Sequence, residues 1–422
     1  MPEMRVSLHA PTYGEEEIAA VVEVLRSGRV TMEAGDRVVA FERAFAEKFG
    51  FKHAIMVNSG SSANLLAVSA LVSNGDLPHA SYREERGSLY VLTPAVCWPT
   101  SVWPFMQHGY TPLIVDVDPK TWCMDAAAAR RAVEDHRGGV CATVPVEVYG
   151  NATYDERLWV PNFPIVDDCC EALGTKKRIG DLVSIGKYAE VATFSFYFSH
   201  HITTLEGGLC ATDDDDLADV LRIQRAHGWL RDLSDERQAE QLRRCTPRAY
   251  ERDGCPTDWD ERFVFVDMGY NLRPTEVAAA IGLVQLRKLD DLVKRRNDNW
   301  ESFRRGLDEW REFFDFQEAA PGCEPAWFGF GMIVREEAPF TRADLRRYLE
   351  SRGVETRPII AGNIARQPGM RRYPHVVAGP LTVADRIMDR AFSIGIHQGV
   401  GMAEREYVVE CFRRFIQGGE RA

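Results

Sequence analysis

Apolar and polar positions form alternating blocks along the first two thirds of the chain. Short apolar runs at residues 53–57 and 89–93 are each followed by a segment of helical periodicity, at residues 61–71 and 100–108. Strands that alternate with helices in this way predict βαβ units and a mainly parallel sheet. We expect an N-terminal helix at residues 15–27 and further strands at residues 112–117, 140–146, 165–168, 191–196 and 209–212.

The last third of the chain has a different pattern. A helix is predicted at residues 275–292, and a smaller α+β domain is predicted by the segments 328–334, 342–351 and 383–390. We therefore expect an α/β protein with a large domain over residues 1–290 and a small C-terminal domain over residues 291–422. Residues 232–262 are rich in charge and contain proline and glycine, which predicts an irregular insertion.

Composition narrows the class of protein. The chain has 422 residues, 45% of them hydrophobic, which is enough to bury a large core. Its formal net charge of -12 disfavours a general nucleic-acid binder, which needs a basic surface. No segment has the roughly 20 apolar residues of a membrane helix, so we expect a cytoplasmic protein without a membrane partner. The 10 cysteines should then be reduced thiols, most of them in the core.

Two segments place polar groups where α/β proteins bind ligands. Residues 58–64 lie between a predicted strand and a helix, where free N–H groups and the helix dipole bind phosphate. The same residues would also suit an N-capping turn without a ligand. Residues 165–174 place carboxylates at the end of a buried strand, where one of them could keep a pyridinium nitrogen protonated. The alternative is that these carboxylates only cap a helix or bind water.

A third segment carries a specific resemblance to a known family. Residues 193–208, together with 269–276 and 278–282, resemble the sugar aminotransferase family of nucleotide-sugar and antibiotic pathways, and the similarity runs from about Tyr13 to the last helix. The resemblance implies the aspartate-aminotransferase fold, fold type I of the pyridoxal phosphate enzymes. This fold has a large cofactor-binding domain with a mixed, mainly parallel sheet and a smaller α+β domain.

At one position the sequence departs from the family pattern. Family members have a lysine before the Glu-Gly-Gly turn that bonds covalently to pyridoxal phosphate, whereas this sequence has His200 there. A branch with histidine for lysine comprises 3-dehydratases of 4-keto-6-deoxy sugars, which bind pyridoxamine phosphate without a covalent link. Residues 356–368, with the sequence Ala-Gly-Asn at 361–363, also resemble this branch. A histidine that only packs in the core is the alternative.

The resemblance assigns further residues to the cofactor. Trp98 matches an aromatic residue that stacks on the ring, although it would be unremarkable in a core. Asn271 matches an asparagine that reaches the phosphate in the neighbouring subunit, which implies a homodimer with a shared active site. An ordinary turn is the alternative for Asn271. The remaining assignments are Asp168 to the pyridine nitrogen, Gly60, Ser61 and Ser195 to the phosphate, and Glu171 to the cofactor site.

These matches imply a reaction. Imidazole cannot replace the covalent role of lysine, but with a pKa near 6.5 His200 can move a proton near neutral pH. The expected activity is removal of the 3-hydroxyl from a nucleotide-linked 4-keto-6-deoxy sugar, with GDP-4-keto-6-deoxymannose as the best match. L-Glutamate is the expected amino donor that regenerates pyridoxamine phosphate.

Three alternatives stay open. An aminotransferase would need another lysine at the cofactor, such as Lys176, Lys177 or Lys187. An iron–sulfur-assisted 3-dehydrase of a CDP-linked sugar would need four cluster ligands, but only Cys245 and Cys255 follow residues 227–229 in that region. We therefore expect no metal. A binding protein that keeps the fold without catalysis is the third alternative. Cys169 and Cys170 are expected to pack.

Overall fold

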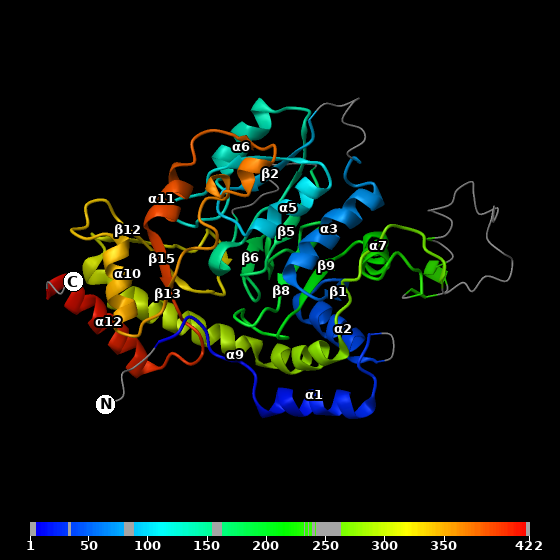
Figure 1. Ribbon diagram of the computed structural model, residues 1–422, viewed down its shortest axis with the longest axis horizontal. Helices are drawn as coiled ribbons and strands as arrows, with labels where there is room; N and C mark the ends of the chain where they lie inside the picture. The colour runs from blue at the N-terminus through cyan, green and yellow to red at the C-terminus, as the bar shows by residue number, and fades with distance from the viewer. Residues whose placement is uncertain are drawn as a thin grey trace.

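A twisted central sheet organises the molecule (Figure 1). The computed structural model describes residues 6–32, 35–79, 88–153, 163–231, 233–234, 236–238, 241 and 263–418. Two four-stranded sheets, ordered β14-β3-β2-β4 and β1-β9-β8-β5, are joined at β4 and β5 by parallel bridges from Thr143 to Ile165 and from Val146 to Asp168. The strands are β1 (His53–Val57), β2 (Tyr90–Pro94), β3 (Thr111–Val115), β4 (Val140–Thr143), β5 (Val166–Asp168), β8 (Val191–Ser195), β9 (Gly208–Thr212) and β14 (Val376–Val377).

The sheet is mixed and mainly parallel, as the sequence predicts. Within it, β9 alone among the described strands runs antiparallel to its neighbours, β1 and β8. These strands are near-continuous apolar runs because helices cover both faces of the sheet. In β1, Met56 packs with one hydrophobic cluster, whereas Ile55 and Val57 pack with another.

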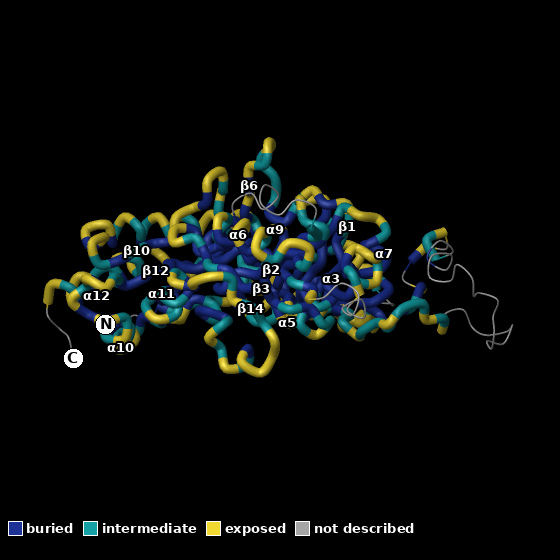
Figure 2. The backbone as a smooth tube through the Cα atoms, turned by 90° about the horizontal axis from the view of Figure 1, so that it is seen from above, coloured by how far each residue is buried: buried dark blue, intermediate teal, exposed yellow. Residues whose placement is uncertain are grey.

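Different helices cover the two faces. The cluster around Met56 includes side chains of α2 (Arg37–Phe49) and α9 (Glu276–Gly306). The cluster around Ile55 includes side chains of α3 (Gly60–Asn74) and α7 (Asp215–Arg225). Figure 2 shows the resulting buried layer between exposed outer surfaces. The remaining helices of this part are α1 (Glu15–Ser27), which packs on α9, α5 (Pro99–Gln107), α6 (Ala126–Asp135) and the 3-10 helix η2 (Val148–Gly150).

The C-terminal part is built on a second, antiparallel sheet. Its order is β10-β12-β15-β13, and its core contains Phe314, Phe330 and Phe392 packed against Phe412. The strands are β10 (Phe314–Phe316), β12 (Phe330–Val334), β13 (Thr356–Arg357) and β15 (Ala391–Ile394). The helices are α10 (Arg342–Ser351), α11 (Thr382–Arg390) and α12 (Met402–Gln417), with 3-10 turns η5 (Asp308–Trp310), η6 (Ile364–Arg366) and η7 (Met370–Arg372). A separate small sheet consists of β6 (Lys176–Ile179), β7 (Asp181–Ser184) and β11 (Cys323–Glu324).

The elements predicted from the pattern are present, with shifted ends. The strand predicted at 140–146 ends at Thr143. Beyond it, the N–H of Val144 still bonds to the carbonyl oxygen of Leu92 (2.9 Å), and Val146 forms an isolated bridge to Asp168 of β5. The helix predicted at 275–292 extends to Gly306 as α9, 31 residues long, so the expected boundary between residues 290 and 291 falls inside a helix. Most of the predicted insertion at 232–262 lies outside the described residues.

Glu276, in the first turn of α9, ties that helix to α2. The N-cap residue of α2, Asp36, provides no side-chain cap, and the buried Glu276 carboxylate instead accepts hydrogen bonds from the N–H groups of Arg37 (2.6 Å) and Val38 (3.1 Å). A carboxylate there also complements the positive end of the α2 dipole. This contact fixes the start of α9 against the large sheet.

We predict that Glu276→Ala lowers the free energy of unfolding by about 1–3 kcal/mol, because two N–H groups lose their acceptor in a buried position. Glu301→Ala on the exposed surface of the same helix is the matched control and should change stability by less than about 0.5 kcal/mol. Urea unfolding of both variants measures the difference. Equal effects of the two changes would contradict the capping role.

Candidate functional site

Asp168 ends β5 at the carboxyl edge of the sheet and is almost fully buried. One carboxylate oxygen accepts hydrogen bonds from Asn64 Nδ2 (2.9 Å) and Ser101 Oγ (2.6 Å), and the other accepts from the N–H of Cys170 (3.1 Å). Asn64 is itself fixed, because its Oδ1 accepts a hydrogen bond from Thr193 Oγ1 (2.6 Å). A buried carboxylate with this many donors has a single orientation.

An anion-binding turn lies beside Asp168. Helix α3 begins at Gly60, and its N-cap residue Ser59 accepts a hydrogen bond from the N–H of Ser62 (3.1 Å). The first N–H groups of a helix have no partner within the helix, so those of Gly60 and Ser61 are free to bind an anion. A Cβ atom on Gly60 would lie 2.6 Å from Cβ of Ser195, so Ser195 closes directly over this turn. The structure thus brings together the three residues assigned to the phosphate.

Trp98 lies at the opening of this turn. It is the N-cap residue of α5, and Thr100 in the same helix bonds through Oγ1 to Ser61 Oγ (2.8 Å). The side chain is 56% exposed, so the alternative of a core tryptophan is wrong. A large exposed aromatic ring beside an anion-binding turn suits a flat ligand that carries a phosphate.

His200 faces the same region from the loop after β8. Its Nδ1 lies 2.7 Å from the carbonyl oxygen of Cys170. Because a carbonyl oxygen only accepts, Nδ1 carries the ring proton and Nε2 keeps a free lone pair. Burial lowers the pKa of His200 to about 4, with further lowering by Arg296 and Arg357, against the raising effects of the Cys170 carbonyl and Asp168. This pKa is below the value near 6.5 expected from the sequence, and His200 is a neutral base at pH 7.

Glu171 is held in a second polar contact of the site. Its Oε2 accepts the N–H of Tyr149 (3.0 Å). Burial raises the pKa of Glu171 to about 7, against lowering by the Tyr149 N–H and Arg357. Near neutral pH the protonated form of the carboxyl group is therefore accessible, and in that form the group can donate a hydrogen bond. Tyr149 itself has a left-handed backbone, with φ of 58°, which for a bulky residue is strained.

Arg296 approaches His200 from α9. This arginine is 3% exposed and donates to the carbonyl oxygens of Phe328 (2.9 Å) and His200 (3.5 Å). It makes no ion pair with any described residue, and burial lowers its pKa to about 10, so it stays charged at neutral pH. Sequence reasoning missed Arg296, since it lies in a strongly charged helical stretch, and also missed Ser101, Thr193 and Tyr149.

Asn271 lies outside this cluster. Its side chain is exposed and its Oδ1 accepts a hydrogen bond from Arg273 Nε (3.0 Å). The next residue, Leu272, accepts the N–H of Asn58 (3.0 Å), which places the segment against the outer side of the anion-binding turn. Whether Asn271 acts in a neighbouring subunit stays a prediction.

The lysines of the aminotransferase alternative lie elsewhere. Lys187 bonds to Asp213 and to the carbonyl oxygen of Gly50. Lys176 and Lys177 lie in β6, which pairs with β7 and β11 outside the central sheet. Nothing in these contacts directs a lysine amine toward Asp168.

The described cysteines are unpaired by disulfides, and the described residues do not meet the requirements of a metal site. Eight described cysteines are free thiols, and Cys169 is buried as expected, whereas Cys170 is partly exposed and its sulfur would lie 3.0 Å from a Cβ on Gly60. Within the described ranges, no group of three or more His, Cys, Asp or Glu side chains is arranged to bind a metal. Cys245 and Cys255 lie outside those ranges. Of the helices in the described part, none has the length and apolarity to cross a membrane.

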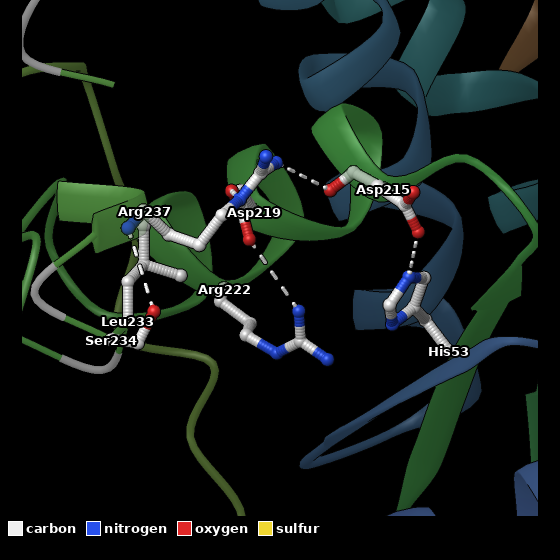
Figure 3. Close-up of a pocket in the computed structure, with 7 residues that line it drawn as sticks. All are labelled: His53, Asp215, Asp219, Arg222, Leu233, Ser234 and Arg237. Carbon is white, nitrogen blue, oxygen red and sulfur yellow. Dashed lines mark hydrogen bonds and ion pairs between the residues drawn. The ribbon is translucent and has the colours of Figure 1, made fainter. Parts of the chain in front are cut away.

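A pocket of about 420 Å³ lies away from the residues described above (Figure 3). His53 and Asp215, 2.7 Å apart, line it, as do Arg237 and Asp219, 2.5 Å apart. His53 pairs with Thr212 at one end of β1 and β9, whereas the anion-binding turn follows the other end, where Val57 pairs with Gly208. The pocket therefore lies at the opposite edge of the sheet, and its charges pair with one another.

The fold and the site together define a vitamin B6-dependent enzyme of fold type I. The comparisons place it more closely: a model of the DegT/DnrJ/EryC1/StrS aminotransferase family matches residues 11–413, and the chain belongs to this family.

Relatives within the family share most of the chain. It is 34% identical over 396 residues to GDP-4-keto-6-deoxy-D-mannose 3-dehydratase of Yersinia pseudotuberculosis, covering 93% of this chain and 94% of the relative. It is also 34% identical over 407 residues to dTDP-4-dehydro-2,6-dideoxy-D-glucose 3-dehydratase of Saccharopolyspora spinosa, covering 95% and 84%. A crystal structure of GDP-4-keto-6-deoxymannose-3-dehydratase with a trapped PLP-glutamate geminal diamine superposes with a TM-score of 0.84 at 31% identity, covering 96% and 99%.

We predict that Arg296→Leu raises the pKa of His200 above its value of about 4 without restoring 6.5, because burial remains while a nearby positive charge is lost. Arg296→Lys should keep the low pKa. The chemical shift of the His200 ring against pH, assigned with a His200→Asn variant, measures it. Arg295→Leu, on the exposed side of the same helix, is the control. A titration unaffected by Arg296→Leu would contradict the electrostatic contact.

Proposed function

We propose that this protein is a pyridoxamine phosphate-dependent 3-dehydratase of a nucleotide-linked 4-keto-6-deoxy sugar. The observation that carries the proposal is His200 in the lysine position, with Nδ1 bonded to a carbonyl and a free Nε2. A base in this state can move a proton but cannot bind the cofactor covalently. The two relatives named above, each 34% identical to this chain, are both 3-dehydratases.

The residues present fit the cofactor. Gly60 has no room for a side chain, and the free N–H groups of the turn suit a phosphate, with Ser61 and Ser195 as hydroxyl donors. Asp168 suits the protonated pyridine nitrogen, Trp98 the ring face, and Glu171 a polar substituent of the ring. When bound, the cofactor supplies an amine for the 4-keto group and a pyridinium that withdraws electrons.

His200 provides the proton transfers. Its neutral Nε2 accepts a proton, and the Nδ1 bond to Cys170 keeps the ring in one orientation while it does so. Because burial lowers its pKa to about 4, the protonated form is a stronger acid than free imidazolium and can give the proton to the departing 3-hydroxyl. Phe328 packs edge-on against the ring, with centroids 5.2 Å apart.

The nucleotide and the amino donor are further parts of the proposal. GDP is our choice because GDP-linked sugars are named for relatives in both the sequence and the structural comparisons, while the relative from Saccharopolyspora acts on a dTDP sugar. L-Glutamate is the proposed amino donor, since a PLP-glutamate adduct is named in a structure with a TM-score of 0.84. Eight free cysteines fit a reducing, cytoplasmic location.

We also propose a homodimer with a shared site. Just before Asn271, the side chains of Phe263, Phe265 and Met268 are 51%, 55% and 84% exposed. Exposed apolar side chains grouped along one segment are typical of a surface that another chain covers. A partner seated there would lie next to Asn271 and could bring the asparagine to a second active site.

The decisive experiment incubates the protein and pyridoxamine phosphate with GDP-, CDP- and dTDP-linked 4-keto-6-deoxy sugars. The expected product is a keto sugar with hydrogen in place of the 3-hydroxyl, and one ammonia is released per turnover. His200→Asn should lower the rate by about 10²–10⁴-fold, and the surface control His375→Asn should not. An amino sugar as the product would establish the aminotransferase instead. Turnover that requires an iron–sulfur cluster and a reductase would establish the iron–sulfur-assisted 3-dehydrase.

Hybrid dimers test the shared site. Mixing inactive His200→Ala and Asn271→Ala subunits gives hybrids with one intact and one doubly damaged site if the two residues act across the interface. Random exchange should then restore about a quarter of the wild-type activity, because half of the dimers are hybrids with one working site each. If mass spectrometry shows exchange and activity stays at the level of the separate variants, Asn271 does not act in the neighbouring subunit.

A further inference from the structure

One face of α9 follows the catalytic loop, residues 196–207, which connects β8 to β9 and carries His200. The N–H of Thr203 in this loop donates to Gln285 Oε1 of the helix (3.2 Å). About three helical turns further along α9, and therefore on the same face, Arg296 donates to the carbonyl oxygen of His200 (3.5 Å). The loop backbone is thus bonded to α9 at the base itself and again three residues beyond it.

The amide of Gln285 uses all four of its hydrogen-bonding positions. Its Oε1 accepts from the Thr203 N–H and from Thr12 Oγ1 (2.6 Å). Its Nε2 donates to the carbonyl oxygen of Thr12 (3.0 Å) and to Glu17 Oε1 (2.8 Å). The side chain is fully buried, and an amide has two donor protons and an oxygen with two lone pairs, so this set of partners is complete. Gln285 therefore joins the catalytic loop to the N-terminal segment, residues 6–13.

Glu17 fixes which way round the amide lies. This buried residue of α1 accepts hydrogen bonds from Lys288 Nζ (2.8 and 3.1 Å) and from the N–H of Gly14 (2.8 Å). Burial raises the pKa of Glu17, but these hydrogen bonds and that of Gln285 lower it further, so the group is a carboxylate at neutral pH. Because a carboxylate only accepts, Gln285 has to present Nε2 to Glu17 and its oxygen to Thr203.

The N-terminal segment is itself anchored at its other end. It crosses α9 before it enters α1 (Figure 1). Four residues of the C-terminal part hold it through a backbone bridge or side-chain hydrogen bonds: Val354, Glu355, His397 and Gln398. Between these anchors and Gln285, the ring of His9 packs edge-on against Phe198, with centroids 5.0 Å apart. Phe198 lies two residues before His200, so the segment also contacts the catalytic loop directly.

We infer that Gln285 is a positioning residue for the catalytic base, because it fastens the N-terminal segment and the catalytic loop to one helix. The Nδ1 bond to Cys170 orients the His200 ring, but the backbone that carries the ring needs its own attachment. Proton transfer requires heavy atoms within hydrogen-bond reach, and a misplacement of about 1 Å can cost roughly 10²-fold in rate. The inference rests on the proposed function.

Exchange of an amide and a carboxylate tests this role. Gln285→Met removes all four hydrogen bonds and should lower the single-turnover rate of dehydration by about 10- to 100-fold. The sugar concentration for half-maximal rate and the affinity for pyridoxamine phosphate should stay within about threefold of the wild type. Gln285→Glu should also be slow, because it brings two buried carboxylates together. Adding Glu17→Gln restores one amide and one carboxylate to the pair beside Lys288, and this double variant should recover most of the rate.

The titration of His200 adds a readout that needs no substrate. Burial lowers the pKa of His200 to about 4 in the wild type. In Gln285→Met the released loop exposes the ring to water, so the pKa should rise toward its ordinary value, and the double variant should reverse the rise. The chemical shift of the ring against pH measures it. Asp125→Ala, which removes the N-cap of α6, is the control that lowers stability at a distance and should change neither the rate nor the titration.

Thermal unfolding of every variant separates a loss of stability from a loss of positioning. A less stable Gln285→Met with wild-type rate and titration would overturn the inference, as would a double variant no faster than Gln285→Glu alone. If Gln285→Met does not fold, Thr12→Val removes a single bond of the amide and should lower the rate by about 3- to 10-fold; an unchanged rate there would also overturn it. If the wild type dehydrates no sugar, the proposed function fails, and the His200 titration still decides whether Gln285 positions the base.

Discussion

The site depends on the backbone of a single residue, Cys170, whose N–H and carbonyl oxygen belong to two successive peptide units. The N–H of this residue donates to Asp168, and its carbonyl oxygen accepts the Nδ1 proton of His200. The preceding turn is fixed because the N–H of Cys169 bonds to the carbonyl oxygens of Asp167 and Thr193. The backbone of one residue therefore holds the side chains of both the base and the buried carboxylate in place. Backbone contacts of this kind leave the identity of residue 170 open while constraining its conformation.

Replacing a lysine with histidine changes how the cofactor must be retained. Under the proposed function, affinity without a covalent bond would come from the anion-binding turn, the exposed Trp98 indole and the Asp168 carboxylate. Noncovalent binding also lets the amine form of the cofactor persist between turnovers, because no protein amine competes for it. Burial keeps the imidazole neutral, and the charge of Arg296 behind the base adds to this effect.

Much of this could be predicted from the sequence. Apolar runs predicted the strands, and the carboxyl end of a buried strand was the expected place for the carboxylates of residues 165–174. The assignment of Gly60 and Ser195 to one phosphate site came from the family resemblance. The protonation state of His200 was not predictable, because it depends on burial and on a carbonyl group 30 residues away in the chain. The full length of α9 was missed since its second half is rich in charge and reads as surface.

One small strand has a mechanical consequence. Chain from the C-terminal part returns as β14 to the edge of the large sheet, where Val376 pairs with Leu113 and the N–H of Ala378 bonds to Ile114. Asp116, just after β3, also accepts the N–H groups of Val383 and Ala384 at the start of α11. Together with α9, which runs continuously between the two parts, these contacts connect the two sheets at separate points. A swing of one part against the other would have to break sheet hydrogen bonds, so admission of a bulky nucleotide sugar falls to side chains and loops around the opening.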